Sequence, residues 1–261
     1  MVETKQRTDR RDTDEQGIRA RGIYLLPNLF TSAALFAGFY AIVQAMNEQY
    51  ELAAIAIFIA MVMDGLDGRV ARMTNTQSAF GAEYDSLSDM VSFGVAPALI
   101  MYEWALQPMK KLGWIAAFLY CACAALRLAR FNTKLEDPFQ DKRFFQGLPS
   151  PAAAALLAGF VWVSYEYNVD GREIFFGALQ MKWIAWCLTI FAAGSMVSDL
   201  KFYSGKDINL KASVPFIAIL AIVLGFVLVS YSPPEVLFTV VFVYALSGYY
   251  LWIKQKLSKA V

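Results

Sequence analysis

The sequence predicts an all-α integral membrane protein, a bundle of about eight transmembrane helices with both termini in the cytoplasm. Of its 261 residues 58% are hydrophobic and 17% are charged, whereas soluble domains carry about 25% charged residues. The mean hydropathy is +0.44, and the apolar residues stand in long runs rather than in amphipathic stripes. These observations exclude a disordered chain, a disulfide-stapled secreted module and an ordinary water-soluble core.

Apolar runs of about bilayer length predict the spans. The second and fourth runs are short but continue into polar sequence with helical character, so we expect these helices to protrude from the bilayer. Ser232, Pro233 and Pro234 predict a tight turn between the last two spans. The predicted spans are residues 28–46, 50–63, 87–106, 112–126, 150–166, 182–198, 213–231 and 235–253.

The positive charges predict the orientation of the bundle. With eight spans, the termini and three of the connections share one side of the membrane, and they hold 19 of the 23 Lys and Arg residues. The other side holds Lys110, Lys111, Arg172 and Lys182. Because basic residues favour the cytoplasmic side, both termini are expected there, in a multi-pass protein of the cytoplasmic (inner) membrane.

Three parts of the chain follow from this pattern. Residues 1–22 mix acids and bases without a cleavable signal, which predicts a cytoplasmic N-terminal tail. Residues 23–200 form the membrane core, and residues 201–261 a C-terminal helical hairpin with a short cytoplasmic tail. The net charge of +1 suggests no nucleic-acid partner.

The chain contains no histidine, which excludes an imidazole general base, a Ser-His-Asp triad and a His-ligated metal. The three cysteines, Cys121, Cys123 and Cys187, lie inside apolar runs and are interpreted as packing residues. Carboxylates, hydroxyls and basic side chains are left to carry out any chemistry.

Four aspartates form two pairs at the ends of neighbouring spans. Asp64 and Asp67 are spaced i and i+3 where span two ends, and Asp85 and Asp89 are spaced i and i+4 where span three begins. Each pair therefore lies on one helical face. Because the two spans run in opposite directions, the four carboxylates are expected to converge at the cytoplasmic surface.

Converging carboxylates repel one another unless they are protonated or bind cations. Oxygen ligands without nearby His or Cys favour Mg²⁺ or Mn²⁺ over Ca²⁺, and a two-metal site would suit a pyrophosphate-containing substrate. Solvated acids at helix ends are the alternative for any one of them. Gly68, Ala71 and Gly81 leave room for a ligand near the backbone, although they could also serve helix packing.

The acids belong to a longer motif, D-x-x-D-G-x-x-A-R, eight residues, then G-x-x-x-D-x-x-x-D, over residues 64–89. It resembles the signature of the CDP-alcohol phosphatidyltransferase family. The resemblance implies a membrane enzyme that attacks the pyrophosphate of a CDP-activated substrate and releases CMP, and it implies a homodimer. It also implies roles for the motif residues: Asp64, Asp67, Asp85 and Asp89 as metal ligands, Asp89 also as the base for the acceptor hydroxyl, and Gly68, Ala71, Arg72 and Gly81 in the nucleotide and phosphate pocket.

Wider stretches narrow the resemblance. Residues 78–97, 127–132 and 145–151 are similar to bacterial-type phosphatidylserine synthases. This similarity implies that CDP-diacylglycerol is the donor, that L-serine is the acceptor, and that the products are phosphatidylserine and CMP. Ser78, at the start of the first stretch, is assigned to the donor pocket with the motif residues.

Polar residues beside the acids suggest contacts to both substrates. Arg127 and Arg130, at the cytoplasmic end of span four, can bind the serine carboxylate as a fork, and Asn132 can orient serine. The two arginines could instead anchor the span, or bind a phosphate. Asn28 and Thr31, at the start of span one, can contact the donor, although a helix cap explains them nearly as well.

Two alternatives remain open. One keeps the reaction but uses glycerol 3-phosphate or inositol phosphate as the acceptor. The other is an ion transporter that uses the acidic cluster as its ion site. In the leading interpretation the acyl chains of the donor stay in the membrane lipid, and water-soluble serine enters from the cytoplasm.

Overall fold

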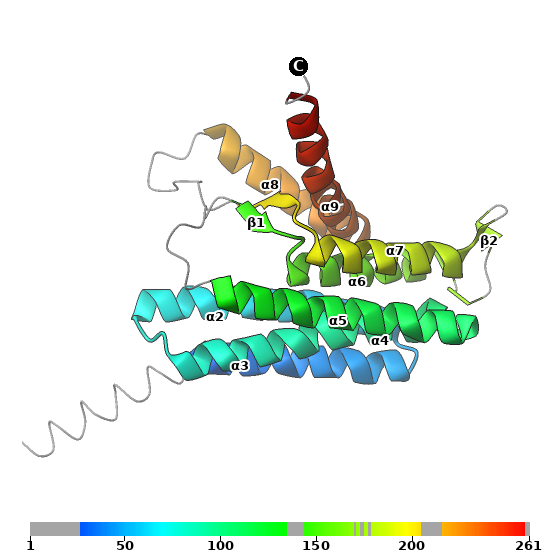
Figure 1. The fold of residues 1–261 in the computed structure, drawn as a ribbon, viewed down its shortest axis with the longest axis horizontal. Helices are drawn as coiled ribbons and strands as arrows, with labels where there is room; N and C mark the ends of the chain where they lie inside the picture. Colours follow the sequence, from blue (N-terminus) through cyan, green and yellow to red (C-terminus); the bar gives the residue numbers. More distant parts are fainter. Residues whose placement is uncertain are drawn as a thin grey trace, which may run out of the picture.

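The computed structural model describes residues 27–134, 144–169, 171–172, 175–176, 179–204 and 216–258, so the predicted tail at 1–22 lies outside the described residues. Within these ranges the chain forms eight helical segments (Figure 1). They are the first helix (Pro27–Met46), α2 (Tyr50–Thr74), a composite third segment of α3 (Ala79–Asp89), η1 (Met90–Val95), α4 (Ala96–Met101), η2 (Tyr102–Leu106) and η3 (Gln107–Met109), then α5 (Lys111–Lys134), α6 (Ser150–Glu166), α7 (Met181–Val197), α8 (Phe216–Tyr231) and α9 (Pro233–Ser258).

Two short antiparallel ribbons modify the all-α prediction. β1 (Phe144–Gln146) pairs with β4 (Lys201–Tyr203), and β2 (Phe175–Phe176) pairs with β3 (Leu179–Gln180). Both ribbons lie in connections between helices. The architecture is therefore helical, with small ribbons that fix the connections.

The predicted spans coincide with the helical segments, but several helices are longer. The helix α2 continues from residue 63 to Thr74, and the third segment begins at Ala79 rather than at residue 87. The apolar runs are shorter than the helices because helical geometry continues through polar residues that hydropathy excludes. Among the described residues, three helices are long and apolar enough to cross a bilayer by length and composition: Pro27–Met46, Lys111–Thr133 and Pro233–Leu257.

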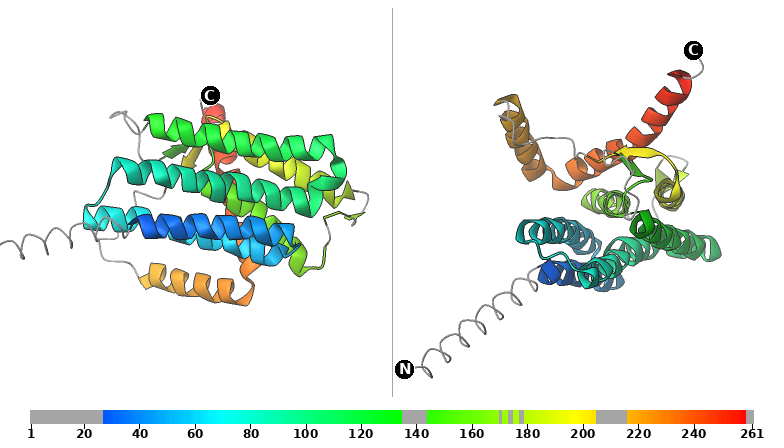
Figure 2. Two further views of the ribbon diagram at one scale, coloured as in Figure 1. Left: turned by 90° about the horizontal axis from the view of Figure 1, so that it is seen from below. Right: turned by 60° about the vertical axis from the view of Figure 1, so that its left-hand side comes forward.

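The helices pack in layers. The first helix, α2, the third segment and α5 run side by side, and α6 and α7 cover α2 and α5 (Figures 1 and 2). The helix α9 packs on α6. Small residues bring the helices close together: a Cβ atom on Gly38 of the first helix would lie 2.6 Å from the Ser92 Cα atom of η1.

The helix α8 stands away from the layers and meets α9 at its end (Figure 2). Its apolar side chains are exposed, among them Ile222 at 68% and Phe226 at 74%. Pro233 opens α9 directly after α8, which is the tight turn predicted between the last two spans.

Near the end of the third segment, the backbone carbonyl of Glu103 has no hydrogen-bond partner within its own helix. The N–H of Gln107, four residues further on, donates to the Tyr102 carbonyl, and the next residue, Pro108, has no N–H. The Glu103 carbonyl must find its donors outside its own helix.

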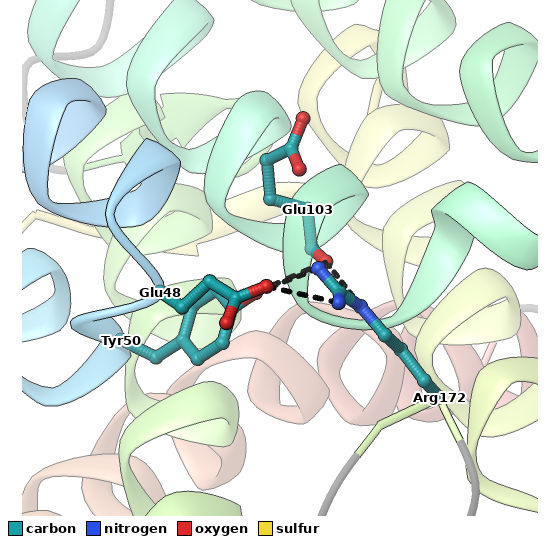
Figure 3. A network of polar contacts seen from close by, with 4 residues as sticks. All are labelled: Glu48, Tyr50, Glu103 and Arg172. Atoms are coloured by element: carbon teal, nitrogen blue, oxygen red, sulfur yellow. Dashed lines mark hydrogen bonds and ion pairs between the residues drawn. The ribbon is translucent and has the colours of Figure 1, made fainter.

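Arg172 and Tyr50 provide these donors (Figure 3). The Arg172 guanidinium donates to the Glu103 carbonyl from Nη2 at 2.9 Å and from Nε at 3.2 Å. It also donates to the Tyr50 hydroxyl and to Glu48, each at 3.1 Å, and the Tyr50 hydroxyl donates to Glu103 at 3.2 Å. We call this cluster, Glu48, Tyr50, Glu103 and Arg172, the arginine clamp. It joins the turn before α2, the end of the third segment and the connection before α7, at one end of the bundle.

Candidate active site

The turn between α2 and α3 sets the position of the acidic residues. Asn75 ends α2 in the left-handed conformation, at φ 52°, and its N–H donates to the Ala71 carbonyl. Ser78 begins α3, and its hydroxyl accepts the Gly81 N–H at 3.0 Å. Four residues between the helices are enough to reverse the chain, so the last turns of α2 face the first turns of α3.

Three of the four predicted acids come together across this turn. Each of Asp64, Asp67 and Asp85 offers a carboxylate oxygen within 4.8 Å of the others. The carboxyl of Asp89 is an electrostatic neighbour of those of Asp64 and Asp85, at the edge of this group. All four side chains therefore belong to one cluster at this end of the bundle.

Burial and mutual repulsion keep protons on this cluster in the absence of a cation. Burial, and then the charges of Asp67 and Asp64, raise the pKa of Asp85 to about 8. Burial, and then the charge of Asp67, raise the pKa of Asp64 to about 6, and burial also raises the pKa of Asp67. These three acids lie beyond the apolar part of their helices, where protons and cations can compete for them.

The donor set fits a hard divalent cation. The ligand atoms are carboxylate oxygens, which suit Mg²⁺ and Mn²⁺. One of them, Asp85 Oδ1, is buried and has no hydrogen-bond partner among the described residues. A buried carboxylate oxygen without a partner is costly, and a cation between Asp64, Asp67 and Asp85 would satisfy it.

The first helix supports the cluster from one side. The Thr31 hydroxyl donates to Asp67 Oδ2 at 2.8 Å, and the Ser88 hydroxyl donates to the Thr31 carbonyl at 3.1 Å. The Asn28 amide oxygen lies 3.5 Å from the place of a Cβ atom on Gly81. Of the two residues predicted to contact CDP-diacylglycerol from this helix, Thr31 orients Asp67 and Asn28 lies beside Gly81 of the motif.

The other residues assigned to the donor pocket lie along the same turn. The Arg72 guanidinium lies over Gly68, with Nη1 3.5 Å from the place of a Cβ atom there. The carbonyl of Ala71 is used to end α2, and the hydroxyl of Ser78 is used to cap α3. A Cβ atom on Gly81 would lie 3.1 Å from the Ser78 hydroxyl, so a side chain at this position would crowd the cap of α3.

The predicted acceptor residues differ in their positions. Arg127 of α5 is an electrostatic neighbour of Asp89, and its Nη1 donates to the Ser150 hydroxyl at 2.6 Å. Arg130 binds Asp199 and donates to the Val197 carbonyl at 3.2 Å. A substrate carboxylate at Arg130 must therefore compete with Asp199.

Asn132, the third predicted acceptor residue, contacts α3. Its amide donates to the Ser86 hydroxyl at 2.8 Å. Ser86 directly follows Asp85 in the sequence, so this contact brings the end of α5 beside the acidic cluster.

Three residues of this region were missed from the sequence. Ser150 lay within the stretch 145–151 without a role of its own, and Asp199 is 69 positions from its partner Arg130. Tyr244 of α9 is an electrostatic neighbour of Arg127, and its hydroxyl donates to the Tyr203 carbonyl at 3.2 Å. Sequence spacing could not reveal these contacts because they join different elements at separations that carry no periodic pattern.

An apolar helical bundle whose α2–α3 turn gathers four carboxylates beside basic side chains has the features of a membrane enzyme that acts on phosphate esters. Residues 24–193 match the CDP-alcohol phosphatidyltransferase family. The chain belongs to this family, and it is a transferase of phospholipid biosynthesis.

Several relatives carry the same name, CDP-diacylglycerol–serine O-phosphatidyltransferase. The protein of Helicobacter pylori strain J99 is 34% identical over 236 residues, which cover 88% of this chain and 92% of that protein. The protein of Mycobacterium leprae is 36% identical over 78% of this chain and 67% of its own length. The Saccharomyces cerevisiae protein is 38% identical over 49% of this chain and 50% of its own length.

Proposed function

We propose that this protein is a metal-dependent CDP-diacylglycerol–serine O-phosphatidyltransferase, which makes phosphatidylserine and CMP. The observation that carries this proposal is the cluster of Asp64, Asp67 and Asp85, whose oxygens lie within 4.8 Å of one another, beside Asp89 and Arg127. The names of the relatives support CDP-diacylglycerol and L-serine as the substrates.

The residues have distinct roles in this reaction. Asp64, Asp67, Asp85 and Asp89 would hold Mg²⁺ or Mn²⁺, and we propose two such ions. Such ions, when bound, supply positive charge that stabilises the phosphates of the donor and the departing CMP. Asn28, Thr31, Gly68, Ala71, Arg72, Ser78 and Gly81 contact or shape the place of the donor.

Asp89 accepts the proton of the serine hydroxyl as attack proceeds, because a hydroxyl is a weak nucleophile near neutral pH. The serine oxygen forms a bond to the phosphorus that carries the diacylglycerol. The bond from this phosphorus to the oxygen of CMP breaks, and CMP leaves with the electron pair. Arg127 binds an oxyanion of a substrate, either the serine carboxylate or a phosphate of the donor, and Arg130 and Asn132 border the same region.

We further propose eight membrane spans in the inner membrane, with both termini and the acidic cluster on the cytoplasmic side. The tail at 1–22, the core at 23–200 and the hairpin at 201–261 are the corresponding parts of the chain. A homodimer completes the proposal, and the mass of the detergent-solubilised protein measured by light scattering would test it. Cysteine labelling from each side of the membrane would test the orientation.

The reaction is tested with purified protein in mixed micelles of detergent and CDP-diacylglycerol. Mg²⁺ or Mn²⁺ is added with L-serine, glycerol 3-phosphate or inositol phosphate in separate reactions, and CMP and the lipid product are measured. We expect cation-dependent CMP release together with phosphatidylserine in the serine reaction.

Other outcomes would replace this function. Strong turnover with another acceptor and none with serine would change the substrate but keep the reaction. Cation flux into liposomes without CMP release would support an ion transporter.

A further inference from the structure

Ser150 is held rigidly at the first residue of α6. It is fully buried, and it stands between Pro149 and Pro151, whose rings restrict the backbone. Just before it, Gly147 adopts φ 78° and its N–H donates to the Leu200 carbonyl at 2.8 Å. A Cβ atom on Gly147 would lie 2.2 Å from the Met196 carbonyl oxygen, so the approach of the chain to Ser150 depends on this glycine.

The Ser150 hydroxyl fixes one edge of the Arg127 guanidinium. It accepts the hydrogen bond from Nη1 at 2.6 Å. In the planar guanidinium, the Nε–H lies on the side edge, away from Nη1. The contact with Ser150 therefore sets the direction in which Nε–H points.

The Nε–H of Arg127 is buried and has no hydrogen-bond partner among the described residues. An unsatisfied buried donor is costly, and more so in a charged group. Arg127 is also an electrostatic neighbour of Asp89, so the free edge belongs to the region where the reaction is proposed. A substrate oxyanion would satisfy this donor, because guanidinium edges bind carboxylate and phosphate groups.

We propose that Ser150 is a positioning residue, which holds the Arg127 guanidinium so that its Nε edge binds an oxyanion of a substrate. This inference rests on the proposed function. The oxyanion is the carboxylate of the acceptor or a phosphate of the donor, since both have the same chemistry toward a guanidinium. Ser150 itself touches Arg127, and it acts through that contact.

The test compares Ser150→Ala with Ser164→Ala, a matched control. Ser164 is also a buried serine of α6, but it lies near the opposite end of this helix. Steady-state kinetics measure kcat and the KM values for serine and for CDP-diacylglycerol. We expect Ser150→Ala to raise one KM about tenfold while kcat changes less than about threefold, because a hydrogen bond to a charged group is lost.

The kinetics also identify the source of the oxyanion. A higher KM for serine assigns it to the acceptor, and a higher KM for CDP-diacylglycerol assigns it to the donor. Ser150→Thr keeps the hydroxyl, so its KM values should stay close to those of the wild-type protein.

A double-mutant cycle shows whether Ser150 acts through Arg127. In an Arg127→Lys background, Ser150→Ala should change the same KM less than about twofold. Unchanged KM values in Ser150→Ala, or an equal effect in both backgrounds, would overturn the proposal.

Folding and function are controlled separately. Thermal unfolding of each variant in detergent identifies any loss of kcat that accompanies a destabilised protein, and the KM of the folded fraction still decides the question. A wild-type protein that does not use serine would contradict the proposed function, whereas a wild-type protein that uses serine with no effect of Ser150→Ala would contradict this inference alone.

Discussion

Asp89 has different neighbours from the other three acids. Asp64, Asp67 and Asp85 gather their oxygens within 4.8 Å, whereas Asp89 is an electrostatic neighbour of Asp64 and Asp85 and also of Arg127. It therefore lies near the group that fits a cation and near the arginine that we propose binds a substrate. This position suits a residue that takes the proton from an acceptor hydroxyl.

Replacing Asp89 by Asn tests this role. Asp89→Asn keeps the size of the side chain but cannot accept the proton, so CMP release should fall at least about 100-fold. Binding of CDP-diacylglycerol, measured with a labelled donor, should be retained in part. Glu83→Gln is the control, because Glu83 is an exposed acid on the same helix, and it should keep its activity; full activity of Asp89→Asn would remove the proposed base.

The raised pKa values of the cluster predict how stability depends on pH. In the cation-free folded protein the pKa is about 6 for Asp64 and about 8 for Asp85, against an ordinary value of 3.8. The folded state thus holds protons that the unfolded chain has released, so the free energy of unfolding falls as pH rises through these values. Cations replace the protons, so they stabilise the folded protein most where the acids are ionised.

Thermal unfolding of the metal-stripped protein should show this dependence. The Tm should fall between about pH 5 and about pH 9, and added Mg²⁺ or Mn²⁺ should raise it more at the higher pH. Asp85→Asn should reduce both effects. An equal shift by the cation at both pH values, or the same shift in Asp85→Asn, would show that the cation binds elsewhere.

At the scale of elements, the first helix depends on a close contact with the third segment. Gly38 faces Ser92 so closely that a Cβ atom would lie 2.3 Å from the Ser92 hydroxyl and 2.6 Å from its Cα atom. The same two elements join near the acids through Ser88 and Thr31. Separating the helices at Gly38 should therefore disturb the Thr31 support of Asp67.

Gly38→Ala should lower the free energy of unfolding by about 2 kcal/mol, since the new methyl group meets backbone as well as side chain. It should also lower activity through the displaced Thr31. Gly194→Ala is the control, because nothing lies within 4 Å of a Cβ atom at Gly194. Chemical unfolding in detergent would measure both variants, and a neutral Gly38→Ala would show that the helices can separate without cost.

The elements also show what the sequence can predict. The apolar runs located all eight helical segments, and the i, i+3 and i, i+4 spacings placed each pair of acids on one face, because both features are local. The ends of the helices were predicted less accurately, since α2 continues eleven residues past its predicted span. The π-helical turns at Met90–Val95 and Tyr102–Leu106 leave no periodic signal in so uniformly apolar a stretch.

Contacts between distant elements could not be predicted from the sequence. Asp199, the partner of Arg130, lies just after α7, and Ser150, the partner of Arg127, is the first residue of α6; their distances in the chain carry no pattern. The position of α8 away from the other helices was not predicted either, because its residues are as apolar as those of a helix packed inside the bundle. These features depend on how the helices are placed relative to one another.

At the scale of the whole molecule, polar contacts gather at both ends of the bundle. The acids lie at one end of α2, and the arginine clamp includes Tyr50 at the other end. The fifteen residues from Tyr50 to Asp64 span about 20 Å of helix. Stability and catalysis should therefore respond separately to changes at the two ends.

Arg172→Ala tests this separation. It removes two of the three hydrogen bonds to the Glu103 carbonyl, leaving the one from Tyr50, and it removes the partner of Glu48. This loss should lower the free energy of unfolding by about 2 kcal/mol. The KM values for both substrates should stay within about twofold of wild type, because the clamp lies far from the acids. Lys111→Ala, which removes an exposed cation at the same end, is the control, and a large change in KM with an unchanged Tm would contradict the separation.

The arginine clamp also favours one direction of access. Arg172 ties together the turn before α2, the end of the third segment and the connection that precedes α7. Because these contacts hold the helices at that end, we expect their relative motion to be greatest at the opposite end, around the carboxylates. In the proposed orientation, a polar amino acid enters and CMP departs through the same cytosolic opening, and the periplasmic side needs no passage.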